Sequence, residues 1–223
     1  MPISQIKQFG SNIDIVFCVD MTCPSNVAEQ LRNNLPDFYA RLGEKLFEHR
    51  GMKLEKLRVR FVLFKDYKYD PEAMEESQFF LLNEELDGAL AFLDGRYGRG
   101  GGDCFDCAYE GLALAVKSEW TAPADCHRRI ICMATDCLPK ALGEDAGYGN
   151  YPIDMPKSLE EISDIWYGLE RPGRNRIMLY APSCEPWLSF QSWAGLFHTP
   201  VVIGNGCSEI DIFDTLVDLI AIS

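Results

Sequence analysis

The chain has 223 residues, of which 47% are hydrophobic, so it is long enough and apolar enough to form a packed domain. Its 34 acidic and 21 basic residues give a formal net charge of −13, which repels nucleic acid backbones and anionic lipid surfaces. We therefore expect neither a nucleic acid nor a membrane as partner. The first residues contain no basic segment followed by an apolar run, which predicts a cytoplasmic protein. We expect residues 1–11 to be a leader and residues 12–223 to form one domain.

The first half of the chain alternates predicted strands and helices. Residues 13–19 form an apolar, β-branched run typical of a buried strand, and the acidic residue Asp20 follows it. Apolar residues at spacings of three and four predict a long helix over residues 24–48, bent at Pro36. A second strand is predicted over residues 57–65 and is followed by Asp66. A short strand near residues 77–82 and a helix near residues 83–93 come next.

The second half begins with a glycine run at residues 98–102 that leads to Asp103. Apolar residues at helical spacing from Phe105 onward predict a helix there, so the glycine loop delivers Asp103 to a helix N-terminus. Residues 128–135 predict a strand followed by Asp136, and residues 137–156 predict a long loop of the kind that is often functional. Helices at 158–169, 185–194 and 210–220 and strands at 176–181 and 199–203 complete the pattern.

Strands that alternate with helices favour an α/β fold with a doubly wound, mostly parallel sheet between two helical layers, a three-layer α-β-α arrangement. We expect about six strands, one of them a short antiparallel edge strand. Because the carboxyl ends of parallel strands lie at one edge of a sheet, Asp20, Asp66 and Asp136 should meet there, with Asp103 supplied by its loop. Each close pair of carboxylates costs roughly 3 to 4 kcal/mol at an effective dielectric constant of 20, so a cation or a shared proton is needed. Hard oxygen ligands favour Mg²⁺ or Mn²⁺.

Three motifs at these positions resemble those of the von Willebrand factor A family. The run F-C-V-D-M-T-C-P-S at residues 17–25 resembles the Asp-x-Ser/Thr-x-Ser motif of its metal-ion-dependent adhesion site. G-G-G-D at 100–103 resembles the loop with the next ligand, and A-T-D-C at 134–137 resembles the strand end that completes the site. The resemblance covers nearly the whole chain from Asn12 and is closest to compact bacterial cytosolic members of the tellurite-resistance and kinase or phosphatase signalling type. It implies a Rossmann-like fold.

This resemblance also implies a set of metal ligands and a binding function. The ligands carried over are Asp20, Thr22, Asp103 and Asp136. Asp66 is not one of them, and we expect it to be a surface charge or a hydrogen-bond acceptor behind the ligands. The second hydroxyl position of the motif holds Pro24, which cannot bind a metal, so Ser25 or a water takes its place. The implied function is that of an intracellular adaptor: the cation would bind an acidic side chain of a protein partner.

The cysteines suggest a second possibility. Nine cysteines in a chain without a secretion signal indicate reduced thiols, and four of them lie next to the predicted ligands: Cys23, Cys104, Cys107 and Cys137. These thiols could form a Zn²⁺ site or a redox pair in place of the Mg²⁺ site or beside it.

Residues 137–156 would meet the partner through Tyr148 and Tyr151, because aromatic residues are favoured interface anchors.

An enzyme is the third possibility, and the sequence favours it least. A strand that ends in Asp20 is similar to the nucleophile strand of haloacid-dehalogenase-like phosphatases, but Thr22 stands where that family has its acid/base carboxylate. The chain has no nucleophile elbow, no P-loop lysine and no dinucleotide-binding glycine motif beside a strand. We therefore expect a binding protein rather than an enzyme.

Overall fold

A computed structural model gives the fold of the chain. It describes residues 10–22, 27–122, 128–148, 151–169, 174–208 and 211–222. Within these residues none of the helices is long and apolar enough to cross a membrane.

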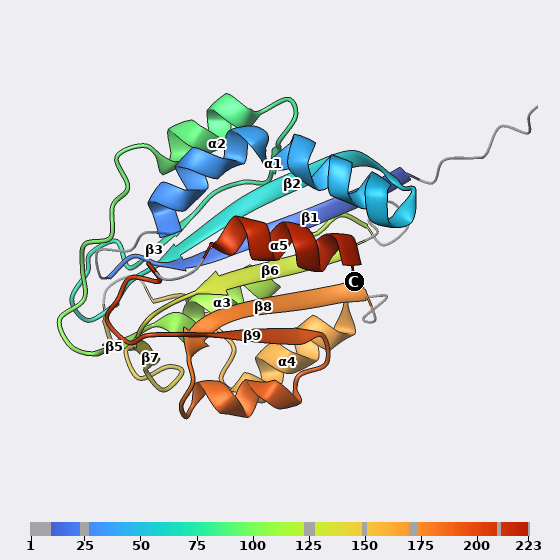
Figure 1. Cartoon of the computed structure of the whole chain (residues 1–223). Coiled ribbons are helices and arrows are strands. Elements are labelled where there is room, and N and C mark those ends of the chain that lie inside the picture. Colours follow the sequence, from blue (N-terminus) through green and yellow to red (C-terminus); the bar gives the residue numbers. More distant parts are fainter. Residues whose placement is uncertain are drawn as a thin grey trace, which may run out of the picture.

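The fold is a mixed α/β structure built on one mostly parallel sheet (Figure 1). The strand order is β3-β2-β1-β6-β8-β9, and β4 also pairs with β2. The parallel strands are β1 (Gly10–Asp20), β2 (Lys53–Phe64), β6 (Arg128–Ala134), β8 (Asn175–Pro182) and β9 (Leu196–Val201). Two short strands, β3 (Met74–Glu76) and β4 (Phe80–Leu81), run antiparallel to β2.

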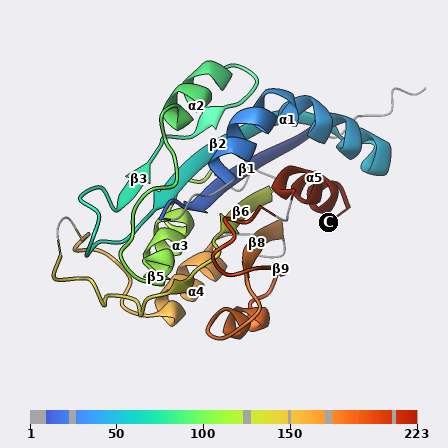
Figure 2. The same cartoon turned by 60° about the vertical axis from the view of Figure 1, so that its left-hand side comes forward.

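Helices cover both faces of the sheet (Figures 1 and 2). One core forms between the sheet and the helices α1 (Val27–Arg50), α2 (Leu86–Leu93) and α5 (Ile212–Ile222). A second core forms on the other face against α3 (Ala108–Val116), α4 (Leu159–Gly168) and the 3-10 helix η2 (Trp187–Ser192). The hydroxyl group of Ser158 caps α4 by accepting a hydrogen bond from the backbone N–H of Glu161.

Strand β1 lies in the middle of this arrangement and is almost completely buried. Its residues alternate between the two cores, because neighbouring side chains of a strand point to opposite faces: Phe17 packs in the first core and Cys18 in the second. The Phe17 ring lies 5.7 Å from that of Phe213 on α5 and 6.0 Å from that of Phe61 on β2. The uninterrupted apolar run at residues 15–19 is therefore explained by burial on both faces.

A small separate sheet lies beyond the carboxyl end of β6 (Figure 1). It pairs β5 (Phe105–Asp106) with β7 (Leu138–Pro139) in parallel. The backbone N–H of Lys140 extends the pairing by donating to the carbonyl of Asp106 at 2.8 Å. This pairing ties the end of the glycine loop to the segment that follows β6.

Several predicted elements differ from the observed ones. Of the strand expected near residues 77–82, only Phe80 and Leu81 form a strand, β4, and a separate short strand, β3, precedes that range. Ser77 lies between the two, and its side chain accepts a hydrogen bond from the backbone N–H of Phe61. The helix expected over residues 185–194 is the 3-10 helix η2. The helix expected from Phe105 onward begins at Ala108, since residues 105 and 106 pair with β7 instead. Gly10 and Ser11, expected in the leader, already belong to β1; residues 1–9 lie outside the described residues.

We predict that Phe17→Ala lowers the free energy of unfolding by about 3 to 5 kcal/mol, because it opens a cavity among three other aromatic rings. Urea unfolding followed by tryptophan fluorescence measures the change. Phe47→Ala is the matched control, since Phe47 is 55% exposed on α1, and it should cost well under about 1 kcal/mol. Equal losses in the two variants would contradict the central position of Phe17.

Candidate functional site

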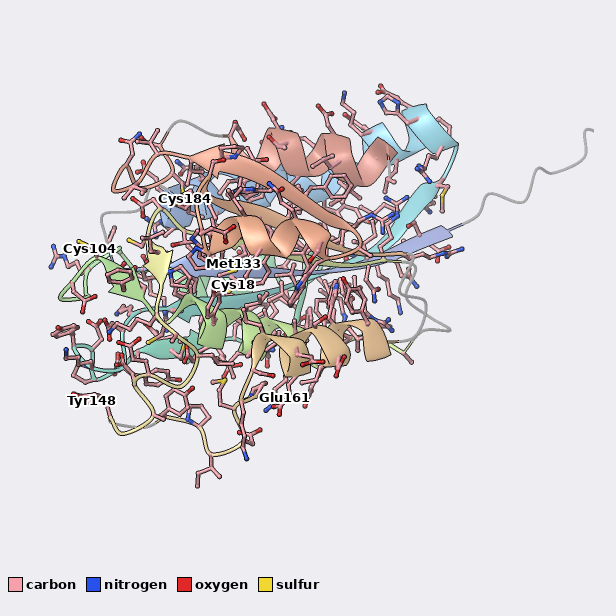
Figure 3. All side chains as sticks on the ribbon, turned by 90° about the horizontal axis from the view of Figure 1, so that it is seen from below. Cys18, Cys104, Met133, Tyr148, Glu161 and Cys184 are labelled. Atoms are coloured by element: carbon pink, nitrogen blue, oxygen red, sulfur yellow. The ribbon has the colours of Figure 1, made fainter. Side chains whose placement is uncertain are left out.

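The carboxyl edge of the sheet collects acidic side chains from three strands. Asp20 ends β1, Asp66 lies two residues beyond β2, and Asp136 lies two residues beyond β6. Each of these three residues is buried. Figure 3 shows this edge at the left, with Cys104 and Tyr148 near it and with Cys18 and Met133 inside the sheet.

Asp20, Asp106 and Cys137 form the first group, here called the acid-thiol cluster. One carboxylate oxygen from each acid and the Cys137 Sγ atom lie within 4.8 Å of one another, and all three residues are buried. The cluster draws on three parts of the chain: the end of β1, strand β5 and the residue before β7. The pairing of β5 with β7 therefore brings Asp106 close to Cys137.

Three hydrogen bonds hold the carboxyl group of Asp20 in place. Its Oδ1 accepts from the backbone N–H of Thr22 at 2.9 Å and from the Thr22 hydroxyl at 2.6 Å. Its Oδ2 accepts from the hydroxyl of Thr135 at 2.7 Å. Burial raises the pKa of Asp20, and these three donors oppose that rise.

The carboxyl group of Asp106 has fewer hydrogen-bond donors than that of Asp20. Its Oδ2 lies 3.0 Å from the Thr22 hydroxyl, but that hydroxyl has one hydrogen and is closer to Asp20. Its Oδ1 is buried without a hydrogen-bond partner. Burial, followed by the charge of Asp20, raises the pKa of Asp106 to about 7. The cluster is therefore one cation or one proton short of being satisfied.

Asp136 points elsewhere. Its Oδ2 accepts a hydrogen bond from the backbone N–H of Gly206 at 2.6 Å, and its carbonyl accepts one from Gly204 at 3.2 Å. It thus fastens the turn after β9 to the end of β6. Its Oδ1 lies 3.9 Å from the thiol of Cys137, and its charge contributes to the raised pKa of Asp20, so it borders the acid-thiol cluster.

The second group, here called the lysine cluster, contains its own cation. The Lys140 Nζ atom lies 2.5 Å from Asp66 Oδ2 and 2.9 Å from Asp145 Oδ2, and the three side chains are at most 4% exposed. Burial acts against the charge on Lys140, but the two carboxylates outweigh it and raise the pKa of the amine. Cys107 also belongs to the group, since its Sγ lies 3.5 Å from Asp145.

Asp103 does not join the acid-thiol cluster; Asp106 occupies the place expected for it. The Asp103 side chain is 36% exposed, and its Oδ1 accepts a hydrogen bond from the backbone N–H of Phe105. Its Oδ2 lies 3.9 Å from Lys140, next to the lysine cluster. The helix expected from Phe105 onward begins only at Ala108, and the pairing of β5 with β7 turns Asp106 inward. A second acid three residues after Asp103 was the available signal.

The remaining expected site residues are divided between different environments. Ser25 and Cys23 lie outside the described residues. Cys104 is exposed, whereas Cys107 and Cys137 belong to different clusters, so the expected thiol site is not assembled. Burial raises the pKa of both Cys107 and Cys137, which keeps them protonated rather than nucleophilic.

The two tyrosines expected to contact a partner also differ. Tyr148 is 45% exposed. Tyr151 is half-buried: its hydroxyl donates to Glu110 at 3.0 Å, and its ring lies 4.8 Å from that of Tyr67. Tyr151 therefore stabilises its own loop, and only Tyr148 is open to a partner.

Other exposed apolar side chains accompany Tyr148 in the segments at the carboxyl edge. They follow β2, α2 and β9 or lie in β5, and we call them the apolar rim: Tyr69, Tyr97, Phe105, Tyr148, Val202 and Ile203, between 42% and 61% exposed. Aromatic side chains of this kind are characteristic of binding surfaces.

Comparisons with known proteins show what this fold resembles. No family model and no curated protein sequence matches the chain. A crystal structure of the pilus adhesin SpaC from Lactobacillus rhamnosus GG matches with a TM-score of 0.54 and 11% identity, covering 95% of this chain and 31% of SpaC. The minor pilin PilB from Streptococcus sanguinis matches with a TM-score of 0.52 and 12% identity, covering 99% of this chain and 63% of PilB. The chain thus spans less than two thirds of either protein.

These matches correct three expectations. Because no family model matches and the matched structures are a pilus adhesin and a minor pilin, the assignment to the von Willebrand factor A family is not upheld. The function inferred from that family, an intracellular metal-dependent adaptor, is therefore wrong, and so is the cytoplasmic location. The alternative functions, a thiol-based Zn²⁺-binding or redox protein and a phosphatase-like hydrolase, gain no support from these matches. The expectation of a non-enzymatic protein agrees with these matches, a pilus adhesin and a minor pilin.

We predict that Asp106→Asn stabilises the protein increasingly as the pH rises. The folded state holds a proton on Asp106 that the unfolded chain releases between about pH 4 and pH 7, so this group costs stability as the pH rises through that range. In urea unfolding with chelator present, the variant should exceed the parent protein by about 1 to 3 kcal/mol at pH 8 and by less at pH 5. Asp37→Asn, at an exposed position of α1, should give no such trend. A pH-independent gain would contradict the assignment of the proton to Asp106.

We also predict that Lys140→Met lowers the free energy of unfolding by about 3 to 5 kcal/mol at neutral pH, because Asp66 and Asp145 then lack their buried counterion. The double variant Lys140→Met, Asp66→Asn should recover part of the loss, since one of the two acids no longer carries charge. Chemical unfolding of the three proteins measures the effect. A single variant as stable as the parent would show that Lys140 does not neutralise the cluster.

Proposed function

We propose that this chain is a non-enzymatic binding domain of a cell-surface protein, comparable in role to an adhesin or minor pilin domain. The fold supports this proposal, because it resembles that of a pilus adhesin and a minor pilin over nearly the whole chain. The observation that carries it is the apolar rim, a set of exposed, mainly aromatic side chains on the edge where α/β sheets bind their ligands. We also propose the finer classification as a doubly wound, Rossmann-like sheet, which the placement of β1 between β2 and β6 supports.

The rim would bind its partner by burying apolar area. Its members rest on rigid supports: the Tyr69 ring packs against Gly102, where a Cβ atom would come within 2.5 Å of it, and Phe105 belongs to the paired strand β5. Rigid aromatic side chains lose little conformational entropy on binding, which favours them as anchors. The cysteines are compatible with a protein at the cell surface, because most of the described thiols are buried inside the fold and so shielded from oxidants.

Two experiments test this function. Labelling of intact native cells with a membrane-impermeant biotin reagent should modify the protein, and the triple variant Phe105→Ser, Tyr148→Ser, Val202→Ser should lose about tenfold or more in affinity for the extracellular protein or glycan that the parent binds. Phe47→Ser removes an equally exposed aromatic residue from α1, outside the rim, and should bind normally. Protein that becomes labelled only after cell lysis, or equal binding by the triple variant and the parent, would overturn the proposal.

We propose in addition that the acid-thiol cluster binds a divalent cation, Mg²⁺ or Mn²⁺ in the first place and Zn²⁺ as the alternative. The partnerless Oδ1 of buried Asp106 supports this, since a cation there would satisfy it and relieve its repulsion with Asp20. The oxygen atoms of Asp20, Asp106 and Thr22 suit Mg²⁺ and Mn²⁺, whereas the Cys137 sulfur suits Zn²⁺. The cation would stabilise the edge that carries the rim.

Thermal unfolding of chelator-treated protein tests the cation. A cation that binds the folded state at about 100 times its dissociation constant adds about 2.7 kcal/mol, so one of Mg²⁺, Mn²⁺ or Zn²⁺ should raise the Tm. Asp106→Asn should abolish that rise, whereas Cys137→Ser should abolish it only if the cation is Zn²⁺. Asp37→Asn is the control and should respond as the parent does. If none of the three cations raises the Tm, the cation proposal is wrong, and a proton on Asp106 satisfies the acid-thiol cluster instead.

A further inference from the structure

Ile153 is the most exposed of the large apolar side chains in the described chain. It lies in a turn that is closed by a hydrogen bond from the backbone N–H of Met155 to the carbonyl of Pro152 at 3.3 Å. The central positions of such turns usually hold Gly, Asn, Asp or Ser, which suit the backbone there, and a β-branched side chain brings no such advantage. Because Ile153 is completely exposed, it also buries no apolar surface within its own chain. Its side chain is therefore available to a partner.

The turn that presents Ile153 is held in place on both sides. Met155 is buried in the second core. The ammonium group of Lys117, the residue after α3, donates to the carbonyl of Asp154 at 2.9 Å and pairs with the carboxylate of the same residue. A side chain presented by a fixed turn loses little conformational entropy on binding, so Ile153 is suited to be an anchor.

A groove of about 670 Å³ lies beside this turn, and we call it the α3 groove. Its lining comes from β2, from the end of β3 and the residues after it, and from the C-terminal end of α3. Pro152 and Asp154, the two neighbours of Ile153, also belong to the lining. The volume is in the range of pockets that hold small ligands, so one aliphatic side chain and part of its turn fit. Ile153 and the α3 groove are thus adjacent on one surface.

The α3 groove offers an apolar surface that is already formed. Phe79, Leu114 and Pro152 supply this surface. The guanidinium carbon of Arg58 lies 4.2 Å from the centre of the Phe79 ring, and the ring centres of Phe79 and Trp120 are 5.8 Å apart. Phe79 and Leu114 also pack against the second core. These contacts fix the apolar lining, so little reorganisation is needed when a side chain enters.

The charges around the α3 groove balance. Three basic and three acidic side chains line it: Arg58, Arg60, Lys117, Glu76, Glu119 and Asp154. Each basic group already has an acidic partner within the chain. None of the buried polar atoms that lack a partner in the described residues lies in this lining, so a small polar ligand would find no unsatisfied group there. In a chain of net charge −13, a second copy is repelled by most of the surface, and this neutral region is where it can approach.

We propose that the α3 groove binds Ile153 of a second copy of the chain, so that two copies form a symmetric dimer. Because Ile153 lies next to its own groove, a two-fold axis beside the turn lets each copy insert its Ile153 into the groove of the other. The contact is then made twice, and the assembly closes at two copies because both use the same surface patch. Neither Ile153 nor the α3 groove belongs to the apolar rim, so this dimer does not depend on the function proposed above.

Sedimentation velocity at protein concentrations from about 1 to 200 µM tests the dimer. The parent should pass from monomer to dimer as the concentration rises, with no larger species. Ile153→Ser should weaken the dimer about 100-fold or more, because two buried isoleucine contacts are lost at once and each contributes about tenfold. Ile165→Ser is the matched control: Ile165 is an exposed isoleucine on α4, outside the groove, and this variant should dimerise as the parent does.

Blocking the α3 groove tests the other half of the contact. Gln78 is exposed at the groove, so Gln78→Arg places a charged side chain where Ile153 would bind, with little risk to the fold, and should also weaken the dimer. An equimolar mixture of Ile153→Ser and Gln78→Arg should associate about tenfold more tightly than either variant alone, because one copy keeps its isoleucine and the other keeps an open groove. Thermal unfolding of each variant verifies that it is folded.

Salt distinguishes this contact from charge pairing. Rising salt should tighten the dimer, since it screens the repulsion between two chains of net charge −13. The proposal is overturned if the parent stays monomeric at the highest concentration, if Ile153→Ser dimerises as tightly as the parent, if the mixture associates no better than its components, or if salt loosens the dimer. A parent that stays monomeric but binds another protein through Ile153 would assign the groove to that partner and likewise overturn the proposal.

Discussion

The structure depends on how negative charge is neutralised where parallel strands end. Parallel pairing brings the ends of β1, β2 and β6 to one edge, and with them Asp20, Asp66 and Asp136. Two buried carboxylates about 4 to 5 Å apart repel by roughly 3 to 4 kcal/mol at an effective dielectric constant of 20, a large part of the net stability of a domain. Each carboxylate is stabilised by a different kind of group. Asp20 accepts hydrogen bonds from a backbone amide and from hydroxyl groups, Asp136 accepts one from a loop amide, and Asp66 pairs with the ammonium group of Lys140.

One short segment contributes to both the acid-thiol cluster and the lysine cluster. Residues 137–140 contribute Cys137 to the acid-thiol cluster and Lys140 to the lysine cluster, and strand β7 between them pairs with β5. The indole N–H of Trp187 donates to the carbonyl of Cys137 at 2.9 Å, which fixes the segment to the second core. The two clusters share this support but differ in one respect. The lysine cluster contains its own cation, the ammonium group of Lys140, whereas one carboxylate oxygen atom of Asp106 has no hydrogen-bond partner. An external cation or a proton is therefore needed at one cluster and not at the other.

Much of the fold could be predicted from the sequence because periodicity reports burial directly. The apolar run before Asp20 and the three- and four-residue spacing from Val27 to Leu46 correspond to β1 and α1. Short pairings are different, since two residues of β5 have no periodicity and are strands only because β7 lies next to them. That is why the sequence predicts Asp103, rather than Asp106, as a ligand. Lys140 was missed for a related reason: a lysine in a long loop gives no sign that two distant acids will enclose it.

The polarity of the strands gives the molecule two chemically different ends. Strands that run in one direction place acids and the apolar rim at their carboxyl edge, and the same direction places Arg128, Arg174 and Arg176 at their amino edge, where α1 and α5 end. At this amino edge the last carbonyls of α5 accept hydrogen bonds from Arg50 and Arg128, whose positive charges suit the negative end of the helix dipole. A parallel sheet thereby keeps the buried acids of its carboxyl edge and the arginines of its amino edge apart by the length of its strands.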